Sequence, residues 1–437
     1  MRWVIYNVLF ALVYAAMLPK FLLRMKQRGG YRNRFADRFG RYPADVAARL
    51  RAMNGAVWIH AVSVGEVYVA GQMMRALRAC APDQRFVLST TSSTGWKEAE
   101  KQVGPNDVLI FNPIDFPACV TRAVEAIRPR AFILTESEIW PNVIRVCHRR
   151  GVPLFLINAR VSDRSAPGYR RLRFWFGPAL RMFTAIYAQS SVDKARLAAA
   201  GADPRAIEVT GSFKFDVARR APEKEKAVAA YLSRCGIADD SRVLLGGSTW
   251  PGEDAVLISI YKRLRTAHPD LRLVIVPRHF EKADAVQAEI ERAGFLCVRK
   301  SRMPVPAPAD PAAVVLGDTT GELMGFYGNA DIVFVGKSLC EHGAQNMIEP
   351  CLCGAATLVG PYTENFRPVM SDLLDAGALV QVPDAAGLER EIGRLLDAPS
   401  ARKALGERAV ASVLRRKGVV DRCAGALVKR FKAAGSD

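Results

Sequence analysis

The stretch WIHAVSVGEVYVA, residues 58–70, runs from one apolar segment through a turn of small residues into a second apolar segment. A strand followed by a tight turn and a helix is the repeating unit of a parallel α/β sheet. Its one acid, Glu66, falls in the first turn of the expected helix, just beyond the expected strand. An acid there ordinarily stabilises the helix dipole. It also lies at the edge of the sheet where α/β folds bind ligands, which makes it a candidate functional residue.

Short apolar runs alternate with longer amphipathic segments on both sides of a helix-favouring segment at 218–234, which follows the motif GSFKFD. Candidate strands before this segment lie at 56–62, 85–90, 107–111, 131–135, 153–158 and 185–189. Candidate strands after it lie at 242–248, 272–277, 295–298, 312–318, 331–336 and 356–360, and the pattern beyond 384 is helical. The sequence therefore predicts an α/β fold of two doubly wound halves, with a ligand cleft between the carboxyl ends of their strands.

The amino end differs in composition from the rest of the chain. WVIYNVLFALVYAAML, residues 3–18, contains no charged residue and is followed by a basic flank. We expect a membrane-anchor helix, because the apolar length reaches about 20 residues when the following PKFLL is included. The basic flank would remain cytoplasmic and bind anionic lipid. A cleaved signal peptide is the alternative, and the cysteine pattern argues against export.

The charge balance and the cysteines limit the partners. The 437 residues include 62 Lys and Arg against 43 Asp and Glu, a formal net charge of +19, which favours anionic partners. Nucleic acid is disfavoured, because the basic residues are dispersed and no base-stacking aromatic motif interleaves them. The nine cysteines are odd in number and lie mostly in apolar segments, as in a reduced chain. Only Cys351 and Cys353 are close together, which is a poor zinc pattern, so we expect no metal.

The usual nucleotide-binding signatures are absent from the sequence. Neither G-x-G-x-x-G nor G-x-x-x-x-G-K-[ST] occurs in either half. A phosphate site is expected instead at strand-to-helix junctions rich in small residues, where backbone N–H groups and the helix dipole favour an anion. Four stretches fit this description: SVGE (63–66), GSTWPGED (247–254), GDTTGEL (317–323) and EHGAQNMIEP (341–350).

Further charged residues follow other expected strands. Glu136 and Glu138, in LTESEIWPN, follow a strand of the first half, so two strand ends would direct carboxylates at one cleft. Lys214, in GSFKFD, and Arg278, in VPRHF, interrupt apolar or aromatic surroundings. Exposed cations are usually solvated surface, but these two are at least as well suited to pair with a phosphate or carboxylate.

Three polar residues near the second half's strand ends have structural alternatives. His279 is either a ligand-binding neighbour of Arg278 or a structural histidine. Asn346 and Glu349 have the spacing of a helix N-cap and its capping-box partner. Such a box would itself orient free amides toward a ligand.

Ten motifs in order resemble the 3-deoxy-D-manno-octulosonic acid (Kdo) transferases of lipopolysaccharide assembly. They are HAVSVGE, FNPIDFP, TESEIWPN, LINARVSDRS, GSFKFD, GSTWPGED, VPRHFEK, GDTTGEL, SLCEHGAQNMIEP and VGPYTENFR. The resemblance implies a GT-B glycosyltransferase of two Rossmann-like domains facing across a cleft, preceded by the anchor helix. The donor would be CMP-Kdo and the acceptor the lipid A precursor, a tetraacyl disaccharide bisphosphate. It also implies a site on the cytoplasmic face of the inner membrane, an anionic surface, with no metal and no other cofactor.

The same resemblance implies roles for individual residues. Glu66 matches the general base that deprotonates the acceptor hydroxyl while CMP departs from the opposite face, inverting the anomeric configuration. Glu136 and Lys214 match positions associated with transition-state stabilisation. The positions that match CMP-binding residues are Arg278, His279, Glu322, Leu323, Met324, Asn346, Met347, Ile348 and Glu349.

The chain departs from the family pattern at one place. Where relatives usually read Gly-Gly-His-Asn, it has Gly343, Ala344, Gln345 and Asn346. Gln345 can donate and accept hydrogen bonds but cannot become cationic, which argues against a histidine-mediated phosphate contact. The retained Asn346 and Glu349 argue against loss of the nucleotide site.

The expected organisation has four parts: a membrane anchor with its basic flank (1–34), an acceptor-binding domain (35–217), a CMP-sugar-binding domain (218–420) and a C-terminal basic helix (421–437). Two other functions stay open on the sequence. One is a GT-B transferase that uses a different nucleotide sugar. The other is a catalytically inactive, membrane-bound relative that binds lipopolysaccharide.

Overall fold

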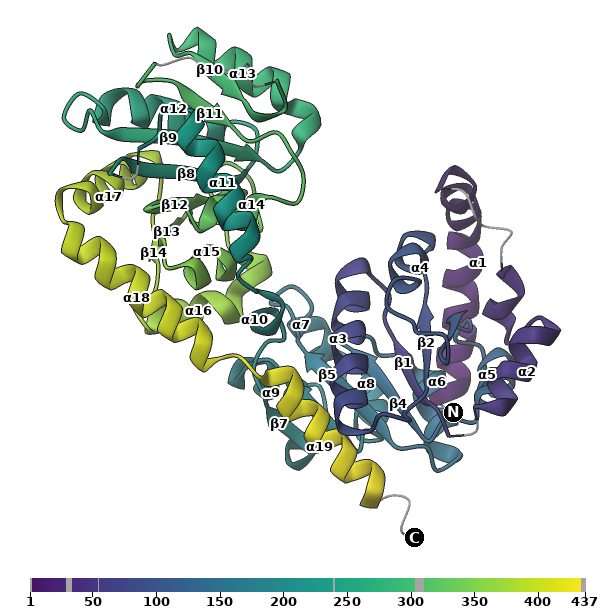
Figure 1. Cartoon of the computed structure of the whole chain (residues 1–437). Coiled ribbons are helices and arrows are strands. Elements are labelled where there is room, and N and C mark those ends of the chain that lie inside the picture. Colours follow the sequence, from purple (N-terminus) through teal and green to yellow (C-terminus); the bar gives the residue numbers. More distant parts are fainter. Residues whose placement is uncertain (1, 29–33, 54, 239, 303–309, 434–437) are drawn as a thin grey trace. The chain divides into compact units, whose positions relative to one another are not determined.

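The computed structural model describes residues 2–28, 34–53, 55–238, 240–302 and 310–433. The chain forms two compact units (Figure 1): unit 1 is Met1–Phe213 with Gly418–Asp437, and unit 2 is Lys214–Lys417. The division falls inside GSFKFD, because Phe213 is buried in a core of unit 1 and Phe215 in a core of unit 2. It therefore precedes the boundary expected at 217/218. The C-terminal helix is part of unit 1 and not a separate region.

Unit 1 contains a seven-stranded parallel sheet in the order β3-β2-β1-β4-β5-β6-β7. Its strands are β1 (Val57–His60), β2 (Phe86–Thr90), β3 (Val108–Phe111), β4 (Ala131–Thr135), β5 (Leu154–Ala159), β6 (Ala185–Ala188) and β7 (Ile207–Val209). The chain order reverses between the neighbours β1 and β4, whose residues pair in parallel from Val57 with Ala131 onward. This reversal is a topological switch point, outside whose carboxyl edge doubly wound sheets bind their ligands.

Helices cover both faces of this sheet. One face packs against α3 (Val64–Cys80), α4 (Ser93–Ala99) and α19 (Val419–Ala433), and α19 lies beside α3 in Figure 1. The other face packs against α2 (Ala44–Ala52), α5 (Pro117–Ile127), α6 (Pro141–Arg149), α8 (Arg173–Leu180) and α9 (Ser191–Ala199). The short helix α7 (Ala166–Arg171) precedes α8. Both faces of every central strand are therefore buried, which explains their continuous apolar sequences.

Unit 2 repeats the architecture with the sheet order β10-β11-β9-β8-β12-β13-β14. Its strands are β8 (Arg242–Thr249), β9 (Leu271–Pro277), β10 (Cys297–Arg299), β11 (Val314–Leu316), β12 (Ile332–Val335), β13 (Ala356–Val359) and β14 (Val380–Gln381). One face packs against α11 (Pro222–Arg234), α14 (Leu323–Tyr327), α15 (Ile348–Cys353), α16 (Arg367–Asp375) and α18 (Pro399–Arg415). The other packs against α12 (Glu253–Leu264), α13 (Ala283–Arg292) and α17 (Ala385–Asp397). The switch point here lies between β8 and β12.

Each strand expected from the sequence is present, and the α/β prediction is confirmed. The two strands that the sequence did not reveal, β7 and β14, are the outermost strands at one edge of each sheet. They span only Ile207–Val209 and Val380–Gln381, too few residues for an apolar run to stand out.

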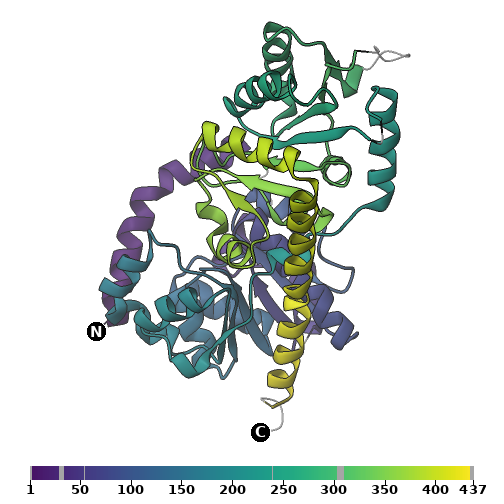
Figure 2. The ribbon, with the colours of Figure 1, turned by 90° about the vertical axis from the view of Figure 1, so that its left-hand side faces the viewer.

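The N-terminal helix α1 (Arg2–Arg28) packs against unit 1 along one side (Figures 1 and 2). Its partly buried positions are 3, 6, 7, 10, 11, 14, 18 and 21, a spacing that places them on one helical face. On this face the Tyr6 hydroxyl donates to Asp115 (2.7 Å), and the Phe10 ring meets Phe116 edge to face. The stretch Trp3–Leu23 is long and apolar enough to cross a membrane.

The opposite face of α1 is apolar and exposed. Its exposed large side chains are Val4, Ile5, Val8, Leu9, Leu12, Val13, Met17, Leu22 and Leu23. A contiguous apolar surface of this kind usually marks a site that contacts a membrane or another protein.

Candidate active site

Glu66 sits in the first turn of α3, directly beyond β1, and its carboxylate is held by hydrogen bonds. Ser63 is the N-cap of α3, and its hydroxyl accepts the Glu66 backbone N–H (3.3 Å) and donates to Oε1 of Glu66 (2.9 Å). The backbone N–H of Val62 donates to Oε2 (2.9 Å). The helix cap therefore orients the acid as well as starting the helix.

A residue from across the switch point completes this arrangement. Thr135, the last residue of β4, places its hydroxyl 3.0 Å from Oε2 of Glu66 and 3.0 Å from the carbonyl oxygen of His60. A hydroxyl has one proton, so Thr135 donates to only one of these acceptors at a time. The charged carboxylate is the stronger acceptor, and the carbonyl remains available when Glu66 is protonated.

Burial prepares Glu66 to accept a proton. Glu66 is only 8% exposed, and this burial raises the pKa of its carboxyl above the ordinary value. The nearby charge of Glu136 raises the pKa further, whereas the hydrogen bonds from Val62, Ser63 and Thr135 lower it in part. A raised pKa makes the carboxylate a better base at neutral pH.

Glu138 forms a carboxylate cluster with Glu66 and Glu136. Burial raises the pKa of Glu138 to about 7, and the charges of Glu66 and Glu136 add to this effect. The indole N–H of Trp140 donates to its Oε2 (2.8 Å), which lowers the pKa in part. The sequence placed Glu138 after the same strand as Glu136. Only the structure shows that burial and two neighbouring acids make it the carboxyl that titrates near neutrality.

Glu136 is held by an ion pair and an unusual backbone. Its φ is +54°, a left-handed conformation that is uncommon outside glycine. Arg160 pairs with its carboxylate at 2.9 Å, and the side-chain amide of Asn158 donates to it at 3.4 Å. Asn158 itself has φ +51° at a register shift in β5, and its Oδ1 accepts the backbone N–H of Phe213 (3.1 Å). Backbone strain of this sort gathers at functional sites.

Lys214 begins unit 2 as the first residue of α10 (Lys214–Val217). Its ammonium group donates to the carbonyl oxygen of Asn365 (2.9 Å) and lies 4.0 Å from the centre of the Phe366 ring. Asn365 belongs to VGPYTENFR, so two of the quoted motifs meet at this lysine. The structure brings together Glu66 and Glu136 within unit 1, and Lys214 belongs to the other unit.

The loops beyond β8 and β12 in unit 2 are tied together by one buried acid. Glu253, in GSTWPGED, is fully buried and accepts the backbone N–H of Trp250 (2.9 Å). Its carboxylate also accepts the consecutive N–H groups of Lys337 (2.8 Å), Ser338 and Leu339 (both 3.0 Å). The sequence marked this junction as a phosphate site, but here a side-chain carboxylate takes up these amides.

Arg278 and Glu349 come together at this end of the sheet. Arg278 follows β9 and is exposed. Burial raises the pKa of Glu349, and the charge of Arg278 lowers it in part, as does a hydrogen bond from Asn346. Asn346 also accepts the backbone N–H of Ile348 (3.1 Å) through Oδ1. Its bond to Glu349 thus joins the two residues that the sequence paired as a capping box.

Aromatic and charged groups lie around His279, the residue after Arg278. The ring of His279 meets that of Trp250 edge to face, with 5.2 Å between the centroids. The ammonium group of Lys337 lies 4.4 Å from the Trp250 ring centre. The imidazole is also 3.4 Å from the carboxylate of Glu281. His279 is therefore partly exposed and lies between an aromatic ring and a carboxylate.

The remaining positions that match CMP-binding residues are Glu322, Leu323, Met324, Met347 and Ile348. Met347 and Ile348 are fully buried in a core of unit 2, and Leu323 and Met324 pack against the same core. The side chains of Met347 and Ile348 are therefore closed to a ligand, whereas those of Leu323 and Met324 are only partly buried. Burial acts to raise the pKa of Glu322, but hydrogen bonds from Thr319 and Lys300 (3.0 Å to Lys300 Nζ) hold it below its ordinary value.

The segment that departs from the family pattern is sharply turned. Gly343 has φ +116° and Ala344 has φ +56°. The N–H groups of Ala344 and Gln345 donate to the carbonyls of Lys337 (2.7 Å) and Gly336 (3.0 Å). Gln345 is thus held by its backbone, while its side chain is only partly buried.

The sequence predicted reduced cysteines and no metal. All nine cysteines are free thiols. In the part of the chain that the structure describes, no group of three or more His, Cys, Asp or Glu side chains is arranged to hold a metal ion.

The chain is similar to known proteins over most of its length. Residues 33–217 match the family model described as 3-Deoxy-D-manno-octulosonic-acid transferase (kdotransferase). The 3-deoxy-D-manno-octulosonic acid transferase of Bordetella pertussis is 36% identical over 418 residues, covering 92% of this chain and 94% of that protein. The transferase of the same description from Haemophilus influenzae is 30% identical and covers 90% of each chain.

Solved structures show the same fold at low identity. A putative UDP-N-acetylglucosamine 2-epimerase from Listeria monocytogenes is 15% identical with a TM-score of 0.59, covering 87% of this chain and 97% of that one. A glycosyltransferase from Rickettsia africae is 13% identical with a TM-score of 0.58, covering 87% and 98%. These likenesses support the expected GT-B fold, and the sequence relatives support the expected family. The chain belongs to the 3-deoxy-D-manno-octulosonic acid transferases, a family of glycosyltransferases.

Proposed function

We propose that this chain transfers Kdo from CMP-Kdo to a hydroxyl group of the lipid A precursor, the tetraacyl disaccharide bisphosphate, with inversion at the anomeric carbon. The observation that carries this proposal is the buried, hydrogen-bonded Glu66 at the switch point of unit 1. Its raised pKa and its fixed orientation are the properties that a general base requires.

In the proposed reaction the acceptor oxygen attacks the anomeric carbon of Kdo from the face opposite CMP. The new oxygen–carbon bond forms as the bond from that carbon to the CMP phosphate oxygen breaks. The hydroxyl proton passes to Glu66, and CMP leaves with the electron pair. As Glu66 becomes neutral, its new O–H can donate to the Thr135 hydroxyl, whose own proton turns to the His60 carbonyl. This exchange would retain the arrangement of the site through the step.

Cationic groups would balance the charge that develops on CMP and the charge already on Kdo. Lys214 is held at its ammonium group by one carbonyl and one ring face. The positive charge of this ammonium group would attract a phosphate or carboxylate. Glu136, fixed by Arg160 and Asn158, would stabilise positive character at the anomeric carbon.

Unit 2 would bind the nucleotide. Arg278 and His279 are the exposed cation and half-exposed imidazole that suit the CMP phosphate, and Glu349 suits the ribose hydroxyls. Glu322 to Met324, Asn346 and Met347 would add contacts from backbone N–H groups at the starts of two short helices, while the Ile348 N–H is taken up by Asn346. Neither a metal nor another cofactor has a part in this proposal.

The proposed location is the cytoplasmic face of the inner membrane. The exposed apolar face of α1 supports membrane contact, and its packed face shows that the helix runs along unit 1. We therefore place α1 in the plane of the membrane surface, with its apolar face in lipid. Leu12→Glu should abolish binding to anionic liposomes in a flotation assay, while Leu414→Glu, an exposed leucine of unit 2, should not. Equal binding by both variants would reject this placement.

The first experiment is a transfer assay in detergent with freshly generated CMP-Kdo and the lipid A precursor, followed by product mass. A product heavier by whole Kdo units supports the function and counts the sugars. Displacement of bound nucleotide by CMP, UDP and GDP is measured alongside. Preference for UDP or GDP would indicate a transferase for another sugar. Binding of lipid without transfer, where a proven Kdo transferase is active, would indicate an inactive relative.

A further inference from the structure

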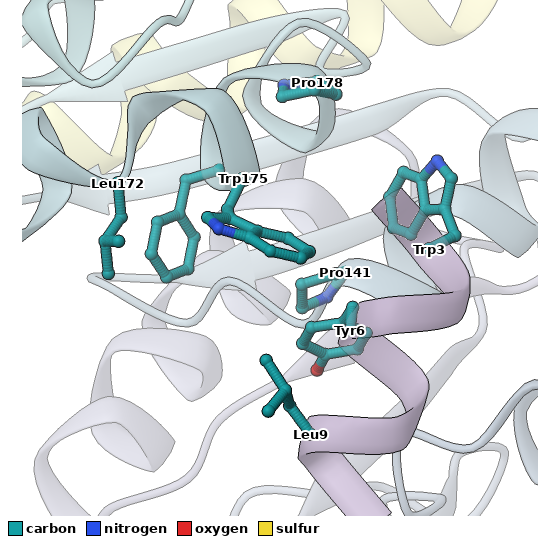
Figure 3. A pocket seen from close by; sticks show the side chains of 8 residues that line it. Trp3, Tyr6, Leu9, Pro141, Leu172, Trp175 and Pro178 are labelled. Atoms are coloured by element: carbon teal, nitrogen blue, oxygen red, sulfur yellow. The ribbon is translucent and has the colours of Figure 1, made fainter. Parts of the chain in front are cut away.

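An apolar cavity lies between α1 and the short helices of unit 1 (Figure 3). It has a volume of about 250 Å³ and is open to the surface. Its lining residues are Trp3, Tyr6, Leu9, Pro141, Leu172, Trp175, Phe176 and Pro178. None of them carries a charge, and the Tyr6 hydroxyl is already bonded to Asp115. The cavity therefore suits a hydrocarbon group and offers little to a polar one.

The mouth of the cavity adjoins surfaces that suit lipid. Leu9 lines the cavity and also belongs to the exposed apolar face of α1. On the other side, Leu172 lines it within the exposed stretch 170–174, where arginines at 170, 171 and 173 alternate with Leu172 and Phe174. Basic and apolar side chains mixed in this way are typical of segments at the surface of an anionic membrane.

The cavity is also joined to the carboxylate cluster by a short piece of chain. Pro141, at the start of α6, is a wall of the cavity. Trp140 immediately before it donates to Glu138, and Glu136 begins the same loop. A basic group stands on the same helix, since the Arg145 guanidinium lies 4.7 Å from the centre of the Trp3 ring. Acids, a cation and an apolar cavity are thus neighbours along one loop and helix.

We propose that this cavity is a subsite for one acyl chain of the glycolipid acceptor. The inference rests on the proposed function, and it adds how the acceptor is positioned. An amphiphile with a sugar, phosphates and acyl chains needs acids, a cation and an apolar cavity close together. The chain would enter from the lipid beside Leu9 and Leu172 while the sugar reaches the carboxylates.

The expected contribution is positioning and not hydrophobic transfer. An acyl chain in a membrane is already surrounded by hydrocarbon, so moving it into the cavity removes little apolar surface from water. Holding the chain orients the sugar hydroxyl toward its base, and such orientation affects kcat/KM. We therefore expect an effect of about 5- to 10-fold, smaller than the loss of a catalytic group.

The test compares Leu9→Trp, which fills the cavity, with Val13→Trp, one turn further along the same exposed face and outside the cavity lining. The full-length protein is assayed in mixed micelles with the tetraacyl acceptor and with an acceptor of the same phosphorylated disaccharide bearing short acyl chains. Leu9→Trp should lower kcat/KM for the long-chain acceptor about 5- to 10-fold and leave the short-chain value unchanged. Val13→Trp should change neither.

Leu172→Trp fills the cavity from a different element and guards against misfolding of α1; it should repeat the result. An acceptor with bromine at the ends of its acyl chains should quench the tryptophan fluorescence of the native protein. Relative to the quenching by brominated phospholipid, this effect should be smaller in Leu172→Trp. Equal kcat/KM losses for long and short chains, or equal effects of Leu9→Trp and Val13→Trp, would overturn the subsite. Quenching by brominated phospholipid alone would show that the cavity takes a bilayer lipid and would also reject it.

Failure of the underlying function looks different in these measurements. Without Kdo transfer to either acceptor by the native protein, the proposed function itself fails. If the native protein transfers Kdo to both acceptors at equal kcat/KM, the function stands and the acyl subsite is rejected.

Discussion

Glu66 in unit 1 and Arg278 in unit 2 both follow strands of a doubly wound sheet, yet their surroundings are opposite. Glu66 is buried, receives hydrogen bonds from Val62, Ser63 and Thr135, and has a raised pKa. Arg278 is exposed, and its charge acts on the partly buried Glu349. A group that must change its protonation state needs an environment that penalises its charge. A group that binds an anion only has to remain charged and accessible.

The largest expected effect is that of replacing Glu66, the buried residue of the two. Glu66→Gln keeps the shape of the side chain but removes its ability to accept a proton. We expect kcat to fall by about 10² to 10⁴-fold with CMP affinity unchanged, measured by product mass and by nucleotide titration. Glu100→Gln, an exposed acid of the same unit, is the control and should keep full activity. A fully active Glu66→Gln enzyme would remove Glu66 from the role of base.

Stability against pH tests how strongly burial opposes charge at Glu138. Its pKa is about 7 in the folded chain and near 4.5 otherwise, so the folded state binds the proton more tightly. The free energy of unfolding should therefore fall as pH rises from about 4.5 to 7. Glu138→Gln should be more stable than the native chain by about 1–3 kcal/mol at pH 8 and equal to it at pH 4. Denaturant titrations at both pH values measure this, and a difference that does not depend on pH would contradict it.

Removal of the exposed cation should have a smaller effect of another kind. Arg278→Ala should weaken CMP binding about 10-fold, because one charge-assisted contact is lost. The native affinity should also depend more steeply on salt than that of the variant. Isothermal titration of CMP at two salt concentrations measures both, with Arg292→Ala, an exposed arginine of α13, as the matched control. An unchanged affinity in Arg278→Ala would separate this residue from the nucleotide.

The smallest expected effect concerns the departure at Ala344. Its φ of +56° costs an alanine about 1–2 kcal/mol, whereas glycine adopts it freely. Glycine also makes the unfolded chain more flexible, which costs about 0.5–1 kcal/mol. Ala344→Gly should therefore stabilise the protein slightly, by about 0.5 kcal/mol, in chemical denaturation. Ala409→Gly, inside α18, should destabilise it by about 1 kcal/mol, and a similar loss in both variants would refute the strain.

The apolar runs predicted the strands well because parallel strands covered on both faces are apolar throughout. The strand-to-helix pattern also placed Glu66 and Glu136 correctly at strand ends of one sheet. The contacts that shape their chemistry could not be predicted in this way. Thr135 is 69 residues from Glu66, and Glu253 is 84 residues from Lys337. Periodicity reports which face of an element is buried, not which distant side chain it meets there.

The sequence by itself determined the two α/β halves, the family, and an apolar helix at the amino end, because local periodicity and ordered motifs carry that information. Tertiary structure alone decided that one side of α1 packs on unit 1 and the other stays exposed, since residues 3–18 carry no charge on any face of the helix. It also joined Trp3, Pro141 and Trp175 around one cavity and enclosed Glu138 beside two other acids. Burial and the proximity of charges set the pKa of a side chain, and both arise only when distant segments pack together.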